Sequence, residues 1–259
     1  MIPSTGTSVI AFFASRVVYG MSQDVARAWK VGSYRLETLL GEGGMGEVWR
    51  ARHRLLARPA AVKLIRPEFL RHSAPSESRH ETIRRFEREA QVTARLKSPH
   101  TVSLYHFGTS DDGSLYYVME LLDGLDLETW VRTYGPLEPD RAVRLLLQVC
   151  HSLKEAHRAQ LVHRDIKPAN IFVCRYGEDV DFVKVLDFGL VGPHPEASGK
   201  KSTITGQIFI GGTPAYLAPE VAAGETMDHR GDIYALGCVA YFLLTGRCVF
   251  DHDNPVDMV

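Results

Sequence analysis

The segment His163–Asn170 and the tripeptide that begins at Asp187 constrain this chain more than any other part of its sequence. Asp165 can accept a proton from a hydroxyl, and Lys167 can neutralise a phosphoryl group in transit. Asn170 and Asp187 can supply oxygen ligands to Mg²⁺. A base, a cation and two metal ligands in one short region indicate phosphoryl transfer from a nucleotide.

Length and composition describe a globular chain. Its 259 residues, 45% of them hydrophobic, are enough for one large domain or two lobes with a real core, so disorder throughout is excluded. The formal net charge of −1 gives no overall attraction for nucleic acid or for an anionic membrane. We therefore expect neither as a partner.

The cysteines and histidines carry no metal signature. Four cysteines are scattered without a CxxC pair, and we interpret them as reduced thiols in the core of a cytosolic domain. A zinc site or a disulfide is the less favoured alternative. The eleven histidines are dispersed and form no HExxH pair, so no transition-metal site is indicated. The expected location is the cytoplasm.

Two apolar runs are too short to span a bilayer. Residues 9–14 follow no Lys or Arg, so a signal peptide is not expected. Residues 1–32 are predicted to be a disordered extension, or sequence upstream of an alternative start at Met21. Residues 234–244 contain Gly237 and predict a buried core helix. A membrane anchor elsewhere in a longer parent protein stays an open alternative.

The first half of the chain alternates short apolar segments with turns. Residues 34–65 predict three antiparallel strands, and residues 81–96 predict an amphipathic helix. Two more strands are expected at 102–108 and 114–120, joined by a hairpin turn at 111–113. These elements predict a small lobe dominated by a sheet.

After Gly124 the pattern becomes helical. Residues 139–158 predict a helix with one face formed by Val143, Leu146, Cys150, Leu153 and His157. The remaining expected elements are short strands near 171–174 and 182–186, a long loop over 187–220, and a helix at 229–245 that Asp228 caps.

Residues 40–48, with the sequence Leu-Gly-Glu-Gly-Gly-Met-Gly-Glu-Val, contain a GxGxxG pattern. The missing side chains let backbone N–H groups approach phosphate oxygens. In a Rossmann unit the third glycine would open a helix, whereas residues 47–51 continue as a strand. The pattern predicts a hairpin lid over a nucleotide, with a plain glycine-rich turn as the alternative.

Together with Ala61-Val62-Lys63 and the segment Val118–Leu122, these motifs resemble the protein kinase family from about residue 34 to residue 250. The resemblance implies an α+β, two-lobed protein-kinase-like fold. It has a small antiparallel β-sheet N-lobe with one main helix and a mostly α-helical C-lobe, truncated after its central helix. The implied catalytic domain spans 33–259, with the N-lobe at 33–120, the hinge at 120–124 and the C-lobe at 125–259.

The resemblance implies ATP and Mg²⁺ as cofactors and a nucleotide site between the lobes. Glu120 and Leu122 would hydrogen-bond the adenine edge through backbone groups, and Met119 would guard the back pocket. The other implied nucleotide-binding residues are Leu40, Gly41, Glu42, Gly43, Gly44, Met45, Gly46, Val48, Ala61, Lys63 and Phe172.

The implied catalytic residues are Asp165, Lys167, Lys63 and Glu89, and the implied metal ligands are Asn170 and Asp187. Lys63 would contact the α- and β-phosphates, held by an ion pair with Glu89 from the 81–96 helix. Glu87 is the second choice for this pair, because Glu89 shares a face with the apolar positions. The pair matters for positioning more than for stability.

Lys167 and Thr213 resemble the serine/threonine class, and the glycine-rich segment with Trp49–His53 resembles the bacterial, eukaryotic-like members. In the family that the sequence resembles, an arginine beside the base, here Arg164, marks enzymes whose activation loop is ordered by phosphorylation, and the resemblance implies the same here, with a merely polar loop as the alternative. The candidate acceptors are Ser202, Thr203 and Thr205, with Thr205 the first choice. Asp232 is expected to anchor the catalytic loop through backbone hydrogen bonds.

The sequence is compatible with two functions. The first is a serine/threonine protein kinase that acts on proteins with Ser/Thr acceptors and self-associates for autophosphorylation. The second is a non-catalytic module that binds nucleotide or a partner, either as a pseudokinase or as an incomplete kinase fragment. The last helix is expected to expose apolar surface, which predicts poor solubility or a fragment of a longer protein. Intact Lys63, Asp165, Asn170 and Asp187 favour the first function.

Overall fold

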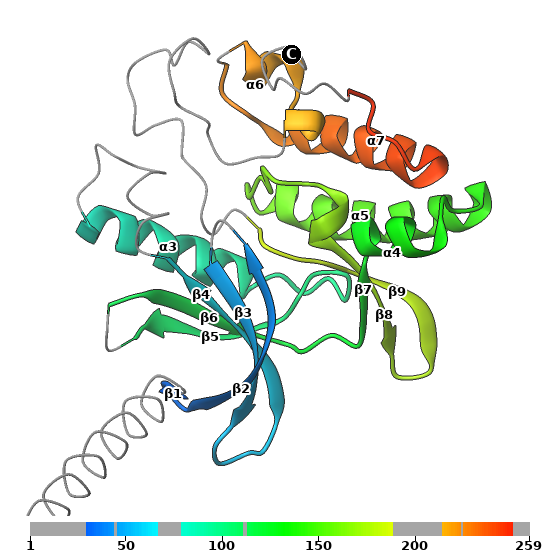
Figure 1. Ribbon diagram of the computed structural model, residues 1–259. Coiled ribbons are helices and arrows are strands. Elements are labelled where there is room, and N and C mark those ends of the chain that lie inside the picture. The colour runs from blue at the N-terminus through cyan, green and yellow to red at the C-terminus, as the bar shows by residue number, and fades with distance from the viewer. Residues whose placement is uncertain are drawn as a thin grey trace, which may run out of the picture.

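The computed structural model describes residues 30–43, 46–66, 79–110, 113–188, 214–223 and 225–250, which form two lobes (Figure 1). Several predictions from the sequence fall outside these ranges. They concern Gly44, Met45, the turn residues 111 and 112, Thr213, and the acceptors Ser202, Thr203 and Thr205.

The first lobe is a six-stranded antiparallel sheet with the strand order β1-β2-β3-β4-β6-β5. Its strands are β1 (Lys30–Val31), β2 (Tyr34–Gly43), β3 (Gly46–His53), β4 (Pro59–Ile65), β5 (Leu104–Thr109) and β6 (Leu115–Met119). The sheet confirms the three strands expected over 34–65 and the two expected after residue 101. Strand β1 pairs with β2 and lies inside the 1–32 segment, which corrects the expected extension at residues 30 and 31, because both belong to the sheet.

Helix α3 (Arg79–Thr93) packs on one face of this sheet (Figure 1). Phe86 and Ala90 are buried against Ile65, Leu115 and Tyr117, which confirms the amphipathic face predicted for this helix. The helix ends before the predicted residue 96. Thr93 donates its hydroxyl to the Glu89 carbonyl in the last turn, and the chain then turns toward Pro99.

The second lobe combines helices with a small sheet. Its elements are β7 (Gly124–Asp126), α4 (Leu127–Tyr134), α5 (Pro139–Arg158), η1 (Pro168–Asn170), β8 (Ile171–Tyr176), β9 (Asp179–Val185), η3 (Pro214–Tyr216), α6 (Pro219–Ala222) and α7 (His229–Thr245). Strands β7, β8 and β9 form a three-stranded antiparallel sheet that faces the first lobe (Figure 1).

Helix α5 has the predicted bounds, and its buried face matches the predicted face only in part, with Leu153 common to both. Its buried residues are Ala142, Leu145, Val149, Ser152, Leu153 and Ala156, whereas Val143 is 55% exposed and Cys150 is exposed. The run of three leucines at 145–147 fits two phases of the helix equally well. Small side chains decide between them, because Ser152 and Ala156 allow close packing and Ser152 bonds Thr101 at 2.6 Å between the two Oγ atoms.

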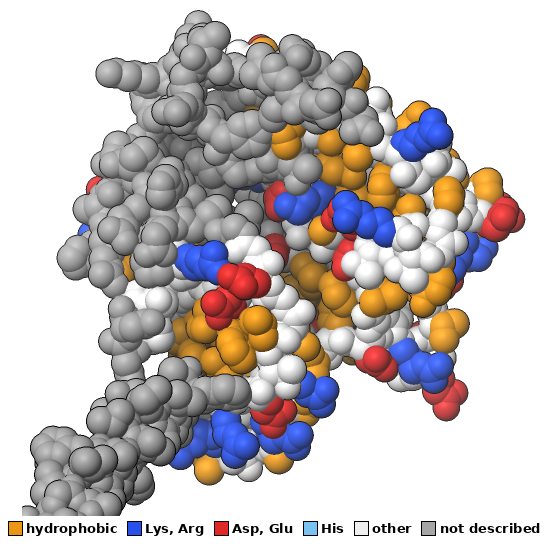
Figure 2. Space-filling view, in the orientation of Figure 1, with side chains coloured by type: hydrophobic (Ala, Val, Ile, Leu, Met, Phe, Trp, Pro, Cys, Tyr) orange, Lys and Arg blue, Asp and Glu red, His pale blue; other side chains and the backbone are white. Residues whose placement is uncertain are grey.

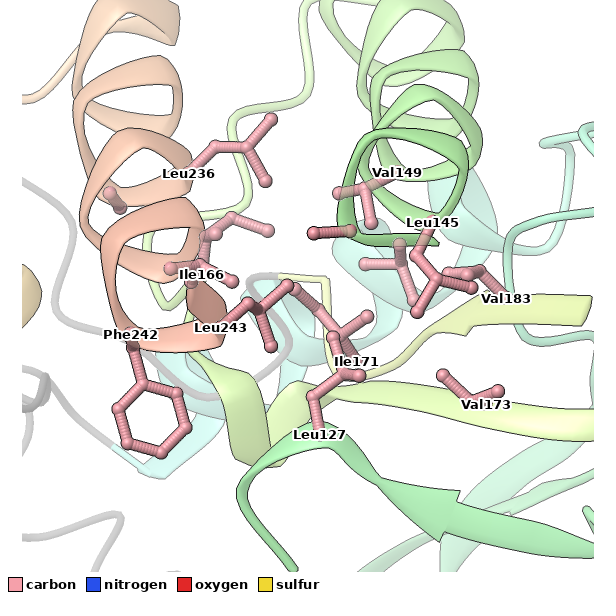
Figure 3. Close-up of a cluster of buried hydrophobic side chains, with 14 of the residues drawn as sticks. Leu127, Leu145, Val149, Ile166, Ile171, Val173, Val183, Leu236, Phe242 and Leu243 are labelled. Atoms are coloured by element: carbon pink, nitrogen blue, oxygen red, sulfur yellow. The ribbon is translucent and has the colours of Figure 1, made fainter. Parts of the chain in front are cut away.

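The core of the second lobe lies between α5, α7 and the β7–β9 sheet (Figure 3). Ile166, from the middle of the segment His163–Asn170, which we call the catalytic segment after its predicted role, points into this core beside Leu243 and is 1% exposed. Its burial fixes the position of the segment on the second lobe.

Helix α7 also meets its prediction. Asp228 caps it by accepting the Arg230 N–H at 2.8 Å, and the helix exposes Ile233, Tyr241 and Leu244 as expected for its apolar surface. Among the described residues, no helix has the length and apolar character that a membrane span requires. The cysteines are all free, although Cys150 is not in the core as predicted.

Candidate active site

The catalytic segment is held from three sides. Asp232 of α7 accepts the backbone N–H groups of His163 and Arg164 at 2.8 and 2.9 Å, which confirms its predicted anchoring role. The His163 ring packs on Phe188 at 4.6 Å, and its Nε2 donates to the Leu186 carbonyl at 2.7 Å. These contacts fix the catalytic segment against Leu186 and Phe188, the residues on either side of Asp187.

Asp165, Lys167 and Asn170 form one hydrogen-bonded group. Lys167 Nζ lies 2.8 Å from Asp165 Oδ2. The Asn170 amide donates to the same carboxylate oxygen at 2.8 Å and to the Asp165 carbonyl at 2.7 Å. The structure therefore brings together the predicted base, the predicted phosphate-neutralising cation and one predicted metal ligand.

Asp187 joins this group through the backbone, because Leu186 N–H donates to the Asn170 carbonyl at 2.9 Å. Asp187 has a φ of 58°, a left-handed conformation that Asp tolerates better than most residues. Lys63 Nζ lies 2.5 Å from its Oδ2, and the Tyr117 hydroxyl donates to its Oδ1. Burial alone would raise the pKa of Asp187, but Lys63 and the hydrogen bonds hold this pKa below its ordinary value.

The predicted ion pair between Lys63 and Glu89 is not the arrangement in this structure. Lys63 bonds Asp187, and Glu89 Oε1 instead lies 3.8 Å from an Arg164 guanidinium nitrogen. Tyr117 stands opposite Lys63 in the β4–β6 pair, and both side chains donate to the Asp187 carboxylate. Glu89 is nevertheless buried and Glu87 exposed, which agrees with the choice of Glu89 as the inward-facing acid.

The glycine-rich segment is the hairpin that was predicted. Gly41 pairs with Val48, and Gly43 pairs with Gly46, so the chain returns as a strand and not as a helix. A Cβ at Gly46 would lie 1.8 Å from the Leu64 carbonyl oxygen, whereas a Cβ at Gly41 or Gly43 would meet nothing within 4 Å. Gly46 is thus required by strand packing, while Gly41 and Gly43 leave open space above the site.

The hinge residues follow β6 directly. Met119 pairs with Ala61 in the sheet, and both are buried. The Glu120 N–H donates to the Ser103 carbonyl at 3.0 Å. Across the gap, Phe172 lies half-buried on β8. Figure 2 shows a hollow between the lobes in which basic, acidic and apolar side chains meet.

Two residues of the site were missed from the sequence. Lys184 is 2% exposed and donates to Glu120 Oε1 at 2.7 Å, and Tyr117 bonds Asp187. A signal existed for Lys184, because it is the one charge in the apolar run 182–186. Tyr117 carried no comparable signal, since an aromatic residue in a buried strand is ordinary.

The described residues could supply one or two oxygen ligands to Mg²⁺, but they do not form a metal site made of protein side chains alone. They contain no cluster of three or more His, Cys, Asp or Glu side chains suited to a metal. Mg²⁺ is commonly bound by one or two protein oxygens together with substrate phosphates. The Asn170 amide N–H groups already bond Asp165, so its side-chain oxygen is the atom that remains as a ligand.

Residues 34–258 match the protein kinase domain family. The chain is 42% identical over 223 residues to the serine/threonine-protein kinase pkn3 of Myxococcus xanthus, with 86% of this chain and 39% of that protein covered. It is 42% identical over 226 residues to the serine/threonine-protein kinase PknB of Mycolicibacterium smegmatis, covering 86% and 34%. The chain thus spans at most about two fifths of these relatives' length.

A solved structure with a similar fold is a double mutant of the PknI kinase domain of Mycobacterium tuberculosis. The TM-score is 0.66 at 28% sequence identity, with 86% of this chain and 76% of that chain covered. This similarity extends over both lobes described above and agrees with the two-lobed fold expected from the sequence.

Proposed function

This chain belongs to the protein kinase family, and from that premise we propose that it transfers the γ-phosphoryl group of Mg²⁺-ATP to serine and threonine hydroxyls of proteins. One observation carries the proposal: Asp165, Lys167 and Asn170 share hydrogen bonds and are tied through Leu186 to Asp187. The bacterial relatives named serine/threonine-protein kinases support the acceptor class.

In this proposal Asp165 orients the acceptor hydroxyl and accepts its proton at a carboxylate oxygen. Lys167, 2.8 Å from that carboxylate, stabilises negative charge on the phosphoryl group. Asn170 and Asp187 would hold Mg²⁺, which when bound supplies charge neutralisation at the phosphate oxygens. Lys63 binds the α- and β-phosphates.

The nucleotide would lie between the two sheets. The Glu120 carbonyl and the Leu122 N–H bind the adenine edge, and Met119 limits the depth of the pocket. The hairpin residues 40–46 cover the phosphates, with Gly44 and Met45 at its tip outside the described residues. Val48 and Ala61 enclose the adenine ring from the first lobe, and Phe172 from the second.

Regulation by phosphorylation of the segment after Asp187 is part of the proposal. The Arg164 side chain is 19% exposed and lies 3.8 Å from Glu89. A phosphate carries about −1.5 to −2 charges and is a stronger partner for a guanidinium than a single carboxylate at that distance. Phosphorylated Thr205, or else Ser202 or Thr203, would draw Arg164 from Glu89 and leave Glu89 to pair with Lys63. Autophosphorylation between two copies would supply this group, in the cytoplasm.

A second candidate function is nucleotide or partner binding without transfer. The observation that favours it is the bonding of both Asp187 carboxylate oxygens, by Lys63 and by Tyr117, in the structure described here. Transfer requires that this carboxylate become accessible to the metal.

The test uses purified protein, both as these 259 residues and extended beyond Val259, with labelled Mg²⁺-ATP and a generic Ser/Thr substrate. Asp165→Asn should lower label transfer by about 10²-fold or more while nucleotide binding is retained, because a general base contributes roughly that factor. Transfer by the extended protein no greater than that of Asp165→Asn would refute kinase activity and leave binding alone. Phosphopeptide mapping of an active sample that finds no phosphate at residues 202, 203 and 205 would remove the regulatory part.

A further inference from the structure

Tyr117 is a buried phenol aimed at a proposed metal ligand. It lies on β6 directly opposite Lys63 of β4, and residues opposite each other in an antiparallel pair share one face of the sheet. Strands β4 and β6 are neighbours in the sheet (Figure 1). Tyr117 is 1% exposed and packs beside Phe86 of α3, with ring centroids 6.4 Å apart. Its hydroxyl donates to Asp187 Oδ1.

Each donor of this strand pair bonds a different oxygen of the Asp187 carboxylate. Lys63 Nζ lies 2.5 Å from Oδ2, and the Tyr117 hydroxyl donates to Oδ1. Hydrogen bonds to an ionised acceptor are the stronger kind, and burial strengthens them further. Lys63 has a proposed second partner in the nucleotide phosphates, whereas the Tyr117 hydroxyl has no proposed role in phosphoryl transfer. The Tyr117 bond therefore acts only on the position of Asp187.

We infer that the Tyr117 hydroxyl competes with the divalent cation for Asp187 and so raises the cation concentration that nucleotide binding requires. This inference rests on the proposed function, since it takes Asp187 as a metal ligand. Tyr117 is a positioning residue in this role, because it acts through Asp187 and touches no substrate. The same bond keeps Lys63 on Asp187, which leaves Glu89 with Arg164 at 3.8 Å.

A purely structural role for Tyr117 predicts a different experimental result. The ring fills space between the sheet and α3, and phenylalanine would fill the same space. If only the ring matters, removal of the hydroxyl changes stability slightly and leaves cation binding unchanged. If the hydroxyl competes for Asp187, its removal strengthens cation binding.

The experiment measures Mn²⁺ binding by electron paramagnetic resonance, with a non-hydrolysable ATP analogue present at a fixed concentration. Tyr117→Phe should bind Mn²⁺ at a roughly tenfold lower concentration than the wild type, as expected when a competing charge-assisted hydrogen bond is lost. Tyr116→Phe is the matched control. It removes the same hydroxyl one residue earlier, from the opposite face of β6, where Tyr116 packs with Tyr34 and Val62.

Equal or weaker Mn²⁺ binding by Tyr117→Phe overturns the inference, as does an equal gain in Tyr116→Phe. Tyr117→Met also lacks the hydroxyl, and it should shift binding in the same direction if Tyr117→Phe unfolds. The Asp187→Asn variant distinguishes a failure of the proposed function from a failure of the inference about Tyr117. If the wild type and Asp187→Asn bind Mn²⁺ equally, Asp187 is no metal ligand and the proposed function fails with the inference. If only the Tyr117 variants match the wild type, the proposed function stands and the inference fails.

Discussion

Lys184 Nζ lies 2.7 Å from Glu120 Oε1, although the lysine is only 2% exposed. The same carboxylate oxygen accepts the Ser103 N–H at 2.8 Å, and the Ser103 carbonyl accepts the Glu120 N–H at 3.0 Å. The Tyr176 and Phe182 rings lie 4.8 and 5.8 Å from the ammonium. This pair connects β9 of the second lobe to the residue proposed to bind the adenine edge.

We expect Lys184→Met to destabilise the protein by about 3 kcal/mol, because removal of one partner leaves a buried charge uncompensated. It should also raise KM for ATP more than it lowers kcat, since the Glu120 backbone loses its support. Chemical denaturation and steady-state kinetics measure the two effects. Glu120→Gln added to Lys184→Met removes the stranded charge and should restore part of the stability. A double variant as unstable as Lys184→Met alone would contradict this account.

Asp232 should control the catalytic segment from a distance. Its carboxylate is fully buried and accepts the His163 and Arg164 N–H groups, and His157 Nε2 lies 2.8 Å from it. In Asp232→Asn the amide nitrogen faces one of these donors, which leaves that donor unsatisfied at a cost of about 2 kcal/mol.

The kinetic signature of Asp232→Asn should be a lower kcat with KM for ATP little changed, because the segment around Asp165 shifts and the hinge does not. Asp228→Asn is the control on the same helix. Asparagine also caps helices well, so this variant should keep both stability and kcat near those of the wild type. Similar losses in the two variants would point to a general weakening of α7.

Elements that depend on neighbouring residues were predicted from the sequence, whereas features that depend on contacts between distant segments were not. The hairpin at 34–53 was predictable because the residues after Gly46 continue a strand pattern, and the start of α5 was predictable because Pro139 suits a first helical turn. The buried face of α5 was predicted only in part, because Leu153 is buried as expected whereas Val143 and Cys150 are exposed. The buried side also carries the bond between Ser152 and Thr101, a contact that joins distant segments.

The site followed the same division. The grouping of Asp165, Lys167 and Asn170 comes from one short segment, and the structure brings these residues together. The partner of Lys63 depends on which carboxylate three separate elements place nearest, and in the structure that carboxylate is Asp187, which Tyr117 of β6 also bonds. The spacing of these residues in the sequence does not predict which carboxylate pairs with Lys63.

Gly46→Ala and Gly43→Ala should differ sharply although both glycines belong to the same hairpin. A Cβ at Gly46, where φ is 155°, would overlap the Leu64 carbonyl at 1.8 Å, so strand β3 must move away from β4. We expect Gly46→Ala to cost more than about 1 kcal/mol of stability even without nucleotide.

Gly43→Ala should leave the stability of the nucleotide-free protein close to that of the wild type, because a Cβ there meets nothing within 4 Å. Its effect should show instead in weaker binding of a fluorescent ATP analogue, if the backbone at Gly43 approaches the phosphates as proposed. Thermal unfolding and fluorescence titration of both variants test the difference. Equal unfolding temperatures for the two variants would show that strand packing does not require Gly46.

His100 lies where the two lobes meet, between α3 and β5. Its Nδ1 donates to the Val183 carbonyl at 3.1 Å, its ring packs on Phe182 at 4.7 Å, and the His151 ring lies 5.5 Å away. Burial lowers the pKa of His100 below its ordinary 6.5. The bond to Val183 opposes this shift, while His151 and Lys184 add to it.

Because the folded state binds the His100 proton less readily than the unfolded state, the stability of the protein should fall as pH drops below about 6.5. His100→Asn keeps a donor for the Val183 carbonyl but cannot be protonated, so its stability should fall less over pH 7 to 5. Urea denaturation at several pH values measures the difference in free energy of unfolding. His106→Asn, which removes an exposed imidazole from β5, is the matched control. If His100→Asn keeps the full pH dependence of the wild type, protonation of His100 does not destabilise the contact between the lobes.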